Sequence, residues 1–195
     1  MARRDGYYVE LDETAEDMLR AGDFLGCGHN GIVYLLKDSK VMKIFKDKNI
    51  CKNEYDLLKK TESSKYFARV YSHGPYYIIK DYVKGERLDY YIRENGINKK
   101  ICCEIIELIK EFRKLEFTKL DIRCKDLYID NDYSMKVIDP RNNYSRGGNY
   151  PRHLMKGLYK LGVLDEFLKI VKEEYNEVYR EWSFKIKRYL YRGVK

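Results

Sequence analysis

The segment Leu25-Gly26-Cys27-Gly28-His29-Asn30-Gly31-Ile32-Val33-Tyr34 decides how the rest of this 195-residue chain is interpreted. Its glycines follow the spacing G-x-G-x-x-G with apolar residues on both sides, which is typical of two strands joined by a turn. Without a Cβ, Gly26, Gly28 and Gly31 are able to adopt positive φ and to let backbone N–H groups approach phosphate oxygens. The segment therefore predicts a phosphate-covering loop, and a glycine-bearing hairpin without a ligand is the alternative.

The residues that follow distinguish between the two folds that use such glycines. Residues 32–36 and 41–45 have the composition of strands, and residues 37–40 have that of a turn. A dinucleotide-binding fold requires a helix directly after the glycines. The strand at this place excludes that fold and favours a sheet that continues through a hairpin.

A lysine, Lys43, lies within the apolar strand 41–45, where a buried ammonium requires a partner. Residues 48–60 have helical spacing, and within them Glu54 is the carboxylate best placed to meet it. We therefore predict that Lys43 and Glu54 form an ion pair.

The remaining amino-terminal sequence completes a small sheet. Residues 6–22 predict a strand or arm followed by a short helix, and residues 68–71 and 76–79 predict two strands around a turn at 72–75. Together with the glycine hairpin they give a five-stranded antiparallel sheet with one helix. The apolar residues of 101–115 recur at intervals of three and four, which predicts a long helix.

Composition limits the classes of protein to which the chain belongs. Charged residues make up 36% and hydrophobic residues 44%, and no apolar run approaches membrane-spanning length. We expect a cytoplasmic protein without a transmembrane segment, and delivery into a host cell as an effector stays open. The five cysteines lack metal-ligand spacing, so reduced thiols packed as small hydrophobic groups are expected.

Positive charge is concentrated at the carboxyl end of the chain. The net charge is +8, and residues 151–195 contain eleven Lys or Arg against six Asp or Glu. A solvated helix face is the simple explanation, and contact with an acidic partner, nucleic acid or an anionic membrane is the alternative. Nucleic acid is not specifically indicated.

From about residue 24 to residue 142 the chain resembles the protein-kinase-like superfamily. In its catalytic loop, H-R-D-x-K-x-x-N, Asp121 matches the aspartate, Arg123 takes the place of the lysine and Asp126 that of the asparagine. The His-Arg pair is absent, because Lys119 and Leu120 occupy its positions. Thirteen residues after Asp126, Asp139 matches the aspartate of Asp-Phe-Gly, although the triplet here is Asp-Pro-Arg.

The resemblance implies a two-lobe α+β fold and a role for each matching residue. The small sheet lobe would span residues 20–82 and a shortened helical lobe residues 83–195, in a single domain of residues 1–195. Asp121 would be the catalytic base, Arg123 would contact the transferred phosphate, and Lys43 would bind the phosphates of ATP, held by Glu54. Asp126 and Asp139 would bind Mg²⁺ or Mn²⁺. The residues expected to bind the nucleotide are Gly26, Gly28, Gly31, Val33, Lys43, Glu54, Asp81 and Val83.

Two departures from the family affect the interpretation. Lys80 precedes Asp81 at a position that usually carries an apolar residue lining the adenine pocket. It is expected to extend to solvent, to pair with Glu54 or Asp139, or to alter the pocket. Only 56 residues follow Asp139, too few for the activation loop, the Ala-Pro-Glu motif and the substrate-binding helices of the family.

The carboxyl-terminal residues predict a loop over 142–150, a helix from about Pro151 and a second helix with apolar residues from Leu164 to Trp182. The second helix is expected to pack on the helix 101–115. The segment after Arg141 is expected to form a short loop without a required regulatory phosphosite, since Leu120 replaces the arginine that captures such a phosphate. In size and in the sequence Ile-Asp-Pro-Arg-Asn of residues 138–142 the chain resembles minimal bacterial kinases and kinase effectors of pathogens.

Three functions follow from this resemblance. The first is an ATP- and Mg²⁺-dependent kinase that phosphorylates Ser or Thr of a protein or of itself. The second is a kinase-like enzyme acting on a small molecule or sugar. The third is a degenerate nucleotide-binding scaffold that acts through protein contacts, and labelling with ATP distinguishes it from the other two.

Overall fold

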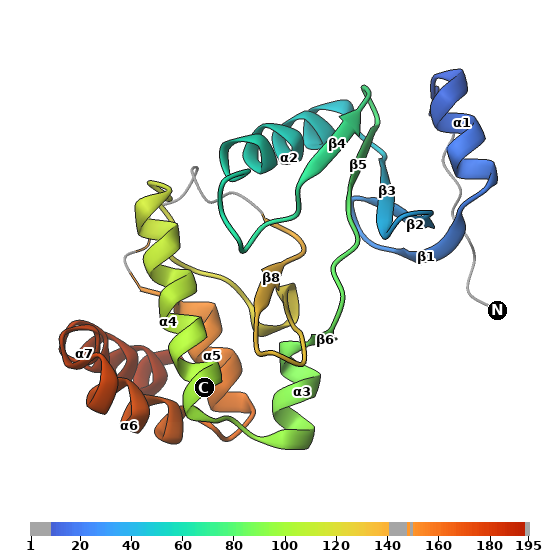
Figure 1. The fold of residues 1–195 in the computed structure, drawn as a ribbon. Coiled ribbons are helices and arrows are strands. Elements are labelled where there is room, and N and C mark those ends of the chain that lie inside the picture. Colours follow the sequence, from blue (N-terminus) through green and yellow to red (C-terminus); the bar gives the residue numbers. More distant parts are fainter. Residues whose placement is uncertain (1–8, 141–147, 149, 194–195) are drawn as a thin grey trace. The chain divides into compact units, whose positions relative to one another are not determined.

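The computed structural model describes residues 9–140, 148 and 150–193. The chain divides into two compact units (Figure 1). Unit 1 comprises residues 1–63 and 67–82, and unit 2 comprises residues 64–66 and 83–195. The expected loop residues 141–147 and 149, which include Arg141, Tyr144 and Ser145, lie outside the described residues.

Unit 1 is built on a five-stranded antiparallel sheet, which confirms the prediction. The spatial order of its strands is β1 (Asp23–Cys27), β2 (Gly31–Leu36), β3 (Lys40–Phe45), β5 (Tyr77–Asp81) and β4 (Val70–His73). The predicted turn at 72–75 is too long, because Ser72 and His73 still pair with Ile79 and Ile78 of β5. A register shift between Val70 and Ser72 lets β4 continue further than its sequence suggests.

The alternation of side chains along β3 gives the sheet two different faces. On one face, Met42 and Ile44 pack with Ala15 of α1 (Glu13–Arg20), the short helix expected before the glycines. Asp12 caps this helix by accepting a hydrogen bond from the backbone N–H of Ala15, and it also accepts one from the Tyr77 hydroxyl at 2.6 Å. The other face carries Lys43 and faces α2 (Lys48–Lys60), whose bounds match the prediction.

Unit 2 consists mainly of helices and contains one small sheet. It begins with β6 (Glu86–Arg87) and α3 (Leu88–Asn95), neither of which was predicted, followed by the expected long helix α4 (Lys99–Lys114). The 3₁₀ turn Cys124–Asp126 leads into β7 (Leu127–Ile129) and β8 (Met135–Val137), and the sheet order is β6-β7-β8. Gly85 is required before β6, since its φ is +94° and a Cβ there would lie 2.2 Å from the backbone oxygen of Ile129.

The core of unit 2 forms around α4. Its buried residues are Ile101, Cys102, Ile105, Ile106, Leu108, Ile109 and Phe112. Helix α5 (Arg152–Lys160) starts directly after Pro151, close to the predicted position. Within the described residues, no helix is both long and apolar enough to cross a membrane.

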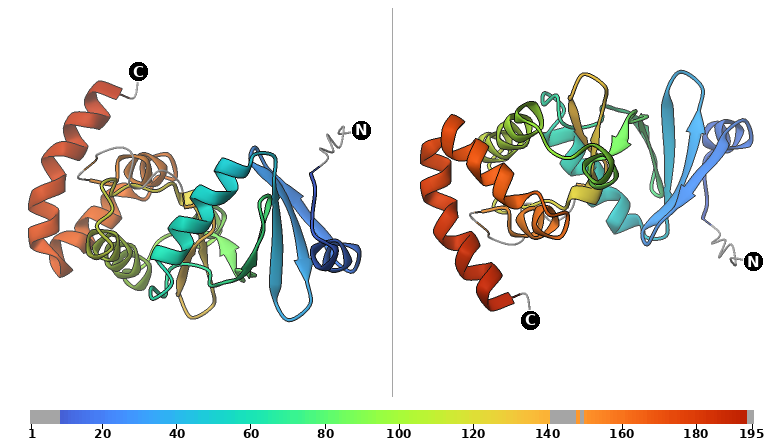
Figure 2. Two further views of the ribbon diagram at one scale, coloured as in Figure 1. Left: turned by 90° about the horizontal axis from the view of Figure 1, so that it is seen from above. Right: turned by 90° about the horizontal axis from the view of Figure 1, so that it is seen from below.

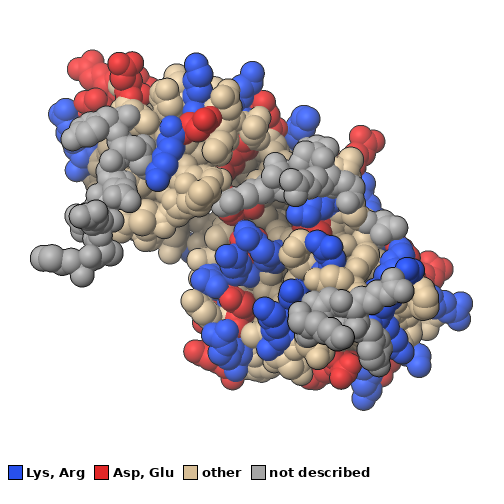
Figure 3. All heavy atoms as spheres, turned by 180° about the vertical axis from the view of Figure 1, so that it is seen from behind, with Lys and Arg blue, Asp and Glu red and all other residues tan. Residues whose placement is uncertain are grey.

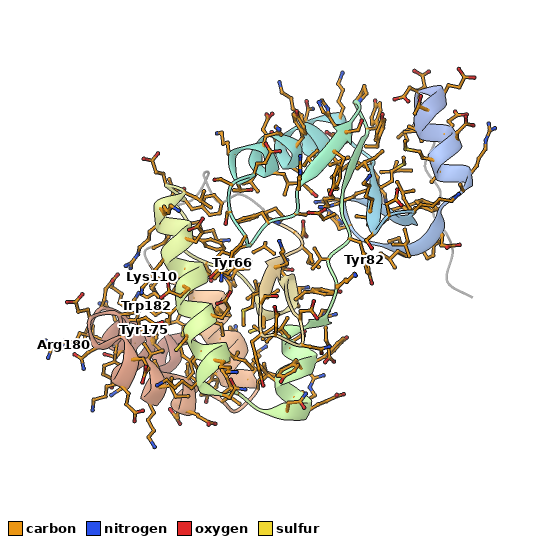
Figure 4. All side chains as sticks on the ribbon, viewed as in Figure 1. Tyr66, Tyr82, Lys110, Tyr175, Arg180 and Trp182 are labelled. Atoms are coloured by element: carbon orange, nitrogen blue, oxygen red, sulfur yellow. The ribbon has the colours of Figure 1, made fainter. Side chains whose placement is uncertain are left out.

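The single helix predicted over residues 164–182 is wrong, because the chain forms two helices that meet at Tyr175. These are α6 (Leu164–Glu174), which packs on α4 as expected, and α7 (Asn176–Gly193), which both views of Figure 2 place at the periphery of unit 2. Tyr175 leaves helical geometry with φ −140° and ψ 58°, and the Lys110 ammonium of α4 lies 4.4 Å from its ring centre (Figure 4). A straight helix over 164–193 would be about 45 Å long. The break instead lets both Phe167 and Trp182 be buried in the same unit.

The cysteines are free thiols, and three of them are buried. Burial raises the pKa of the thiols of Cys51, Cys102 and Cys124 to about 12. These three side chains therefore pack as neutral hydrophobic groups at physiological pH.

Candidate active site

Unit 1 contains a buried cluster of two lysines around one glutamate. Nζ of Lys43 lies 2.5 Å from Oε2 of Glu54, which confirms the predicted ion pair. Nζ of Lys80 lies 2.7 Å from Oε1 of the same carboxylate, so pairing with Glu54 is the outcome among the alternatives considered for Lys80. Burial alone would raise the pKa of Glu54, but the two ammonium groups outweigh it, and the pKa of this carboxyl lies below its ordinary value.

Strand register explains why the two lysines converge. In the antiparallel sheet, Lys43 of β3 pairs with Ile78 of β5, and Lys80 lies two residues further along β5. Residues two apart on a strand share a face, so both ammonium groups project toward α2. Val33 pairs directly with Lys43 and thus lies on the same face of the sheet.

Of the three glycines in the hairpin, one is required by the close approach of two strands, and the other two have empty space beside them. A Cβ at Gly31 would lie 2.1 Å from the backbone oxygen of Ile44, so this glycine permits the close approach of β2 and β3. At Gly26 and Gly28 a Cβ would meet no atom within 4 Å. None of the three glycines uses its ability to adopt positive φ in this structure. The N–H of Gly28 donates to the oxygen of Gly31 at 2.8 Å and is already used by the turn.

Asp81 has a structural function within unit 1. Its carboxylate accepts hydrogen bonds from the backbone N–H of Arg69 at 2.9 Å and from the Tyr71 hydroxyl at 2.8 Å. Its own N–H donates to the oxygen of Arg69. The side chain thus ties β4 to β5. Val83, the other residue of the predicted adenine segment, is half-buried and belongs to unit 2.

In unit 2 the carboxylate of Asp121 is buried and bound to the start of α5. Its Oδ1 accepts hydrogen bonds from the backbone N–H groups of His153 at 2.8 Å and Leu154 at 3.4 Å. Its Oδ2 lies 2.5 Å from Nδ1 of the His153 ring. Asp121 therefore acts as the cap of α5, which has no side-chain cap of its own, and it also holds the histidine.

The two other predicted groups of the catalytic loop contact each other. Nε of Arg123 lies 2.5 Å from Oδ2 of Asp126, and its NH2 lies 3.0 Å from Oδ1. This bidentate pair occupies both oxygens of the carboxylate that was expected to bind metal.

The hairpin β7–β8 brings Asp126 and Asp139 to the same end of a small sheet. Leu127, the residue after Asp126, pairs with Val137, and the N–H of Ile138 donates to the oxygen of Asp126 at 3.1 Å. Thirteen residues of sequence are thereby folded back so that the two aspartates flank one hairpin. This explains the spacing between the two motifs in physical terms.

A divalent-cation site is not preformed by the described side chains. They include no group of three or more His, Cys, Asp or Glu residues arranged to hold a metal ion. For Asp126 to become a ligand, its carboxylate would have to be shared between the metal and the guanidinium of Arg123.

His153 is the residue of the site that sequence reasoning missed. It lies 32 positions from Asp121 and belongs to no motif of the kinase-like pattern. In the sequence, the only indication of this residue is its position in the first turn of the helix expected from Pro151. This position points to a site only once the carboxylate that accepts hydrogen bonds from the N–H groups of the helix is known.

Comparison with known proteins adds two solved structures. No protein-family model matches the sequence, and no curated protein matches it. One of the similar structures is the kinase PK-1 of Cydia pomonella granulovirus, which has 22% identity and a TM-score of 0.48 over 65% of this chain and 53% of that one. Another is APH(2″)-IIa in a ternary complex with streptomycin and ATP, with 21% identity and a TM-score of 0.42 over 60% of this chain and 43% of that one. The chain spans about half the length of these structures.

The described residues form the predicted α+β arrangement, a five-stranded antiparallel sheet in unit 1 and mainly helices in unit 2. The element order of unit 1, with α2 between β3 and β4 of a five-stranded antiparallel sheet, and the helices of unit 2 are those implied by the resemblance. The fold alone does not show whether the protein is a minimal bacterial Ser/Thr kinase, as the sequence predicted.

Proposed function

We propose that this protein is an ATP-dependent phosphotransferase whose acceptor is Ser or Thr of a protein or of the chain itself. The observation that carries the proposal is the buried Lys43–Glu54 pair on the strand that follows a glycine hairpin. A lysine held in this manner presents a fixed ammonium to the α- and β-phosphates of a nucleotide. The open positions at Gly26 and Gly28 leave room for a ligand beside the hairpin.

The other proposed roles follow from the chemistry of each side chain. Gly26, Gly28 and Val33 would cover the nucleotide, Asp81 and Val83 would mark the adenine segment, and Arg123 would stabilise charge on the transferred phosphate. Asp126 and Asp139 are the proposed ligands for Mg²⁺ or Mn²⁺, which would neutralise phosphate charge.

The broader assignments are also proposals. We propose a single kinase-like domain of minimal bacterial type that acts in the cytoplasm, either of its own cell or of a host. The basic carboxyl-terminal part would meet an acidic partner. Lys and Arg side chains are spread widely over one face of unit 2, with acidic ones among them (Figure 3).

The decisive experiment is phosphoryl transfer from labelled ATP. Purified protein is incubated with γ-labelled ATP and Mg²⁺, alone and with added protein or hydroxylated small molecules, aminoglycosides among them, and the label is followed on each. The Lys43→Met variant is expected to lose transfer while keeping its fold, because Glu54 retains Lys80 as a partner. Lys52→Met removes an exposed lysine from α2 and serves as the matched control with wild-type activity. Equal labelling by wild type and Lys43→Met would remove Lys43 from the mechanism.

A nucleotide-binding scaffold is the second candidate, and specific contacts favour it. Asp121 caps a helix and Asp126 is paired with Arg123, so both aspartates have structural partners. The scaffold would bind ATP in calorimetric titration and transfer no label to any acceptor. Binding together with transfer would exclude it.

A further inference from the structure

We propose that His153, and not Asp121, accepts the proton of the incoming hydroxyl, with Asp121 acting as the residue that positions it. This inference rests on the proposed phosphotransferase function. It assigns the proton transfer to a residue outside every motif of the sequence.

Both oxygens of the Asp121 carboxylate already have hydrogen-bond partners. Its side chain is only 6% exposed, and it receives two backbone N–H groups on Oδ1 and the His153 ring on Oδ2. This nearly buried carboxylate, with both oxygens facing α5, is therefore poorly accessible to a substrate hydroxyl.

The contact with Asp121 determines the tautomer of His153. An ionised carboxylate only accepts hydrogen bonds, so Nδ1 of the ring must carry the proton that faces Oδ2 of Asp121. In the neutral ring, Nε2 is then the unprotonated nitrogen with a lone pair. The side chain of His153 is 43% exposed, so the ring is open to an acceptor substrate.

Two contacts with Asp121 hold the His153 ring in a fixed orientation. His153 is fixed twice by the same carboxylate, once through its backbone N–H and once through Nδ1. It also lies in the first turn of α5, which is anchored by the buried Leu154, Met155 and Leu158. A proton acceptor with fixed orientation needs no reorganisation when the reaction occurs.

Tyr150 and Arg152 precede His153 in the chain, and the guanidinium of Arg152 lies 5.4 Å from the Tyr189 ring centre. Burial raises the pKa of the Tyr150 hydroxyl. The charge of Arg152 lowers this pKa, and Tyr189 and Asp121 raise it further. Tyr150 therefore stays neutral at physiological pH, and Asp121 is the negative charge in direct contact with the ring.

The proposed step balances as follows. The acceptor oxygen forms a bond to the γ-phosphorus while the bond from that phosphorus to the β–γ bridging oxygen breaks, releasing ADP. The hydroxyl proton moves to Nε2 of His153, and the resulting imidazolium is stabilised by the Asp121 carboxylate. The proton then passes to solvent and restores the neutral ring.

The test compares His153→Asn with wild type in the labelling assay. The asparagine amide can still donate to Asp121, so the cap of α5 is retained, but it cannot accept a proton. General-base catalysis contributes about 10²–10⁴-fold, and we expect kcat/KM to fall by that factor. Tyr159→Phe, which alters an exposed residue on the same helix, is the matched control and should keep wild-type activity.

Two further readouts separate a proton acceptor from a structural residue. The pH profile of kcat/KM should differ between wild type and His153→Asn, and added imidazole should restore part of the activity of the variant. Label from wild type together with an unchanged rate and pH profile in His153→Asn would overturn the role of His153 alone. No label from wild type would overturn the proposed function as well, so the two failures are distinguishable.

Discussion

Replacing Glu54 by Gln should destabilise unit 1 more than removing either lysine that contacts it. The carboxylate is 5% exposed and lies within 2.7 Å of both ammonium groups, so its loss leaves Lys80 buried without the carboxylate that it contacts and close to a like charge. Breaking a buried pair in this manner costs about 3–5 kcal/mol. Lys80→Met leaves the Lys43–Glu54 pair intact and should cost roughly 0–2 kcal/mol, because an apolar side chain replaces a charge-assisted hydrogen bond.

The assay has to report on unit 1 specifically. The single tryptophan, Trp182, is buried in unit 2, so its fluorescence follows the wrong unit. Native-state hydrogen exchange at the amides of β3 and β5 measures unit 1 directly. The urea dependence of exchange at these amides should show a midpoint lower by about 1.5–2.5 M in Glu54→Gln, taking an m-value of about 2 kcal/mol per molar urea.

The double variant Glu54→Gln, Lys80→Met provides the control. Removing the uncompensated ammonium should recover about 2 kcal/mol of the loss, which is a coupling typical of residues in direct contact. A cost below about 1 kcal/mol for Glu54→Gln, or purely additive effects in the double variant, would refute the reasoning.

The same cluster predicts a pH dependence with a definite sign. The folded-state pKa of Glu54 lies below its ordinary value of 4.5. The stabilisation is therefore fully present above that ordinary value and is lost as the pH falls through the lower folded-state pKa. The free energy of unfolding should be measured for wild type and Glu54→Gln from neutral to acidic pH, and the two values should approach each other only at the acidic end. A difference that stays constant with pH would contradict an ionised, ion-paired Glu54.

Two further predictions concern the glycine hairpin and the metal. Gly31→Ala should lower the free energy of unfolding by about 1–3 kcal/mol, because the added Cβ would contact the backbone of Ile44. Gly28→Ala should change it by less than about 0.5 kcal/mol, because no atom lies near its Cβ position. Equal urea midpoints for the two variants would contradict this prediction. With Asp126 intact, ATP affinity should depend on Mg²⁺ more steeply than in Asp126→Asn, because two carboxylates repel bare ATP. Calorimetric titration with and without metal tests this, and equal metal dependence would show that Asp126 is not a ligand.

Several features of this protein were determined by the sequence alone because they depend on local periodicity. The period-two pattern around Lys43 and the helical spacing around Glu54 place each residue on a definite face of its element. A buried amine requires a nearby carboxylate, and this requirement leaves few candidates. The five strands, α2, α4 and the Lys43–Glu54 pair follow from such rules.

Other features were decided only by the tertiary structure, because they depend on register and on contacts between distant segments. The pairing of Lys43 with Ile78 sets Lys80 beside Glu54, and no local pattern specifies that register. The break at Tyr175 depends on α4, whose Lys110 lies against the Tyr175 ring. Asp121 meets His153 only because α5 begins beside the loop that contains Asp121. The proton acceptor proposed here is therefore specified by packing across 32 residues of sequence.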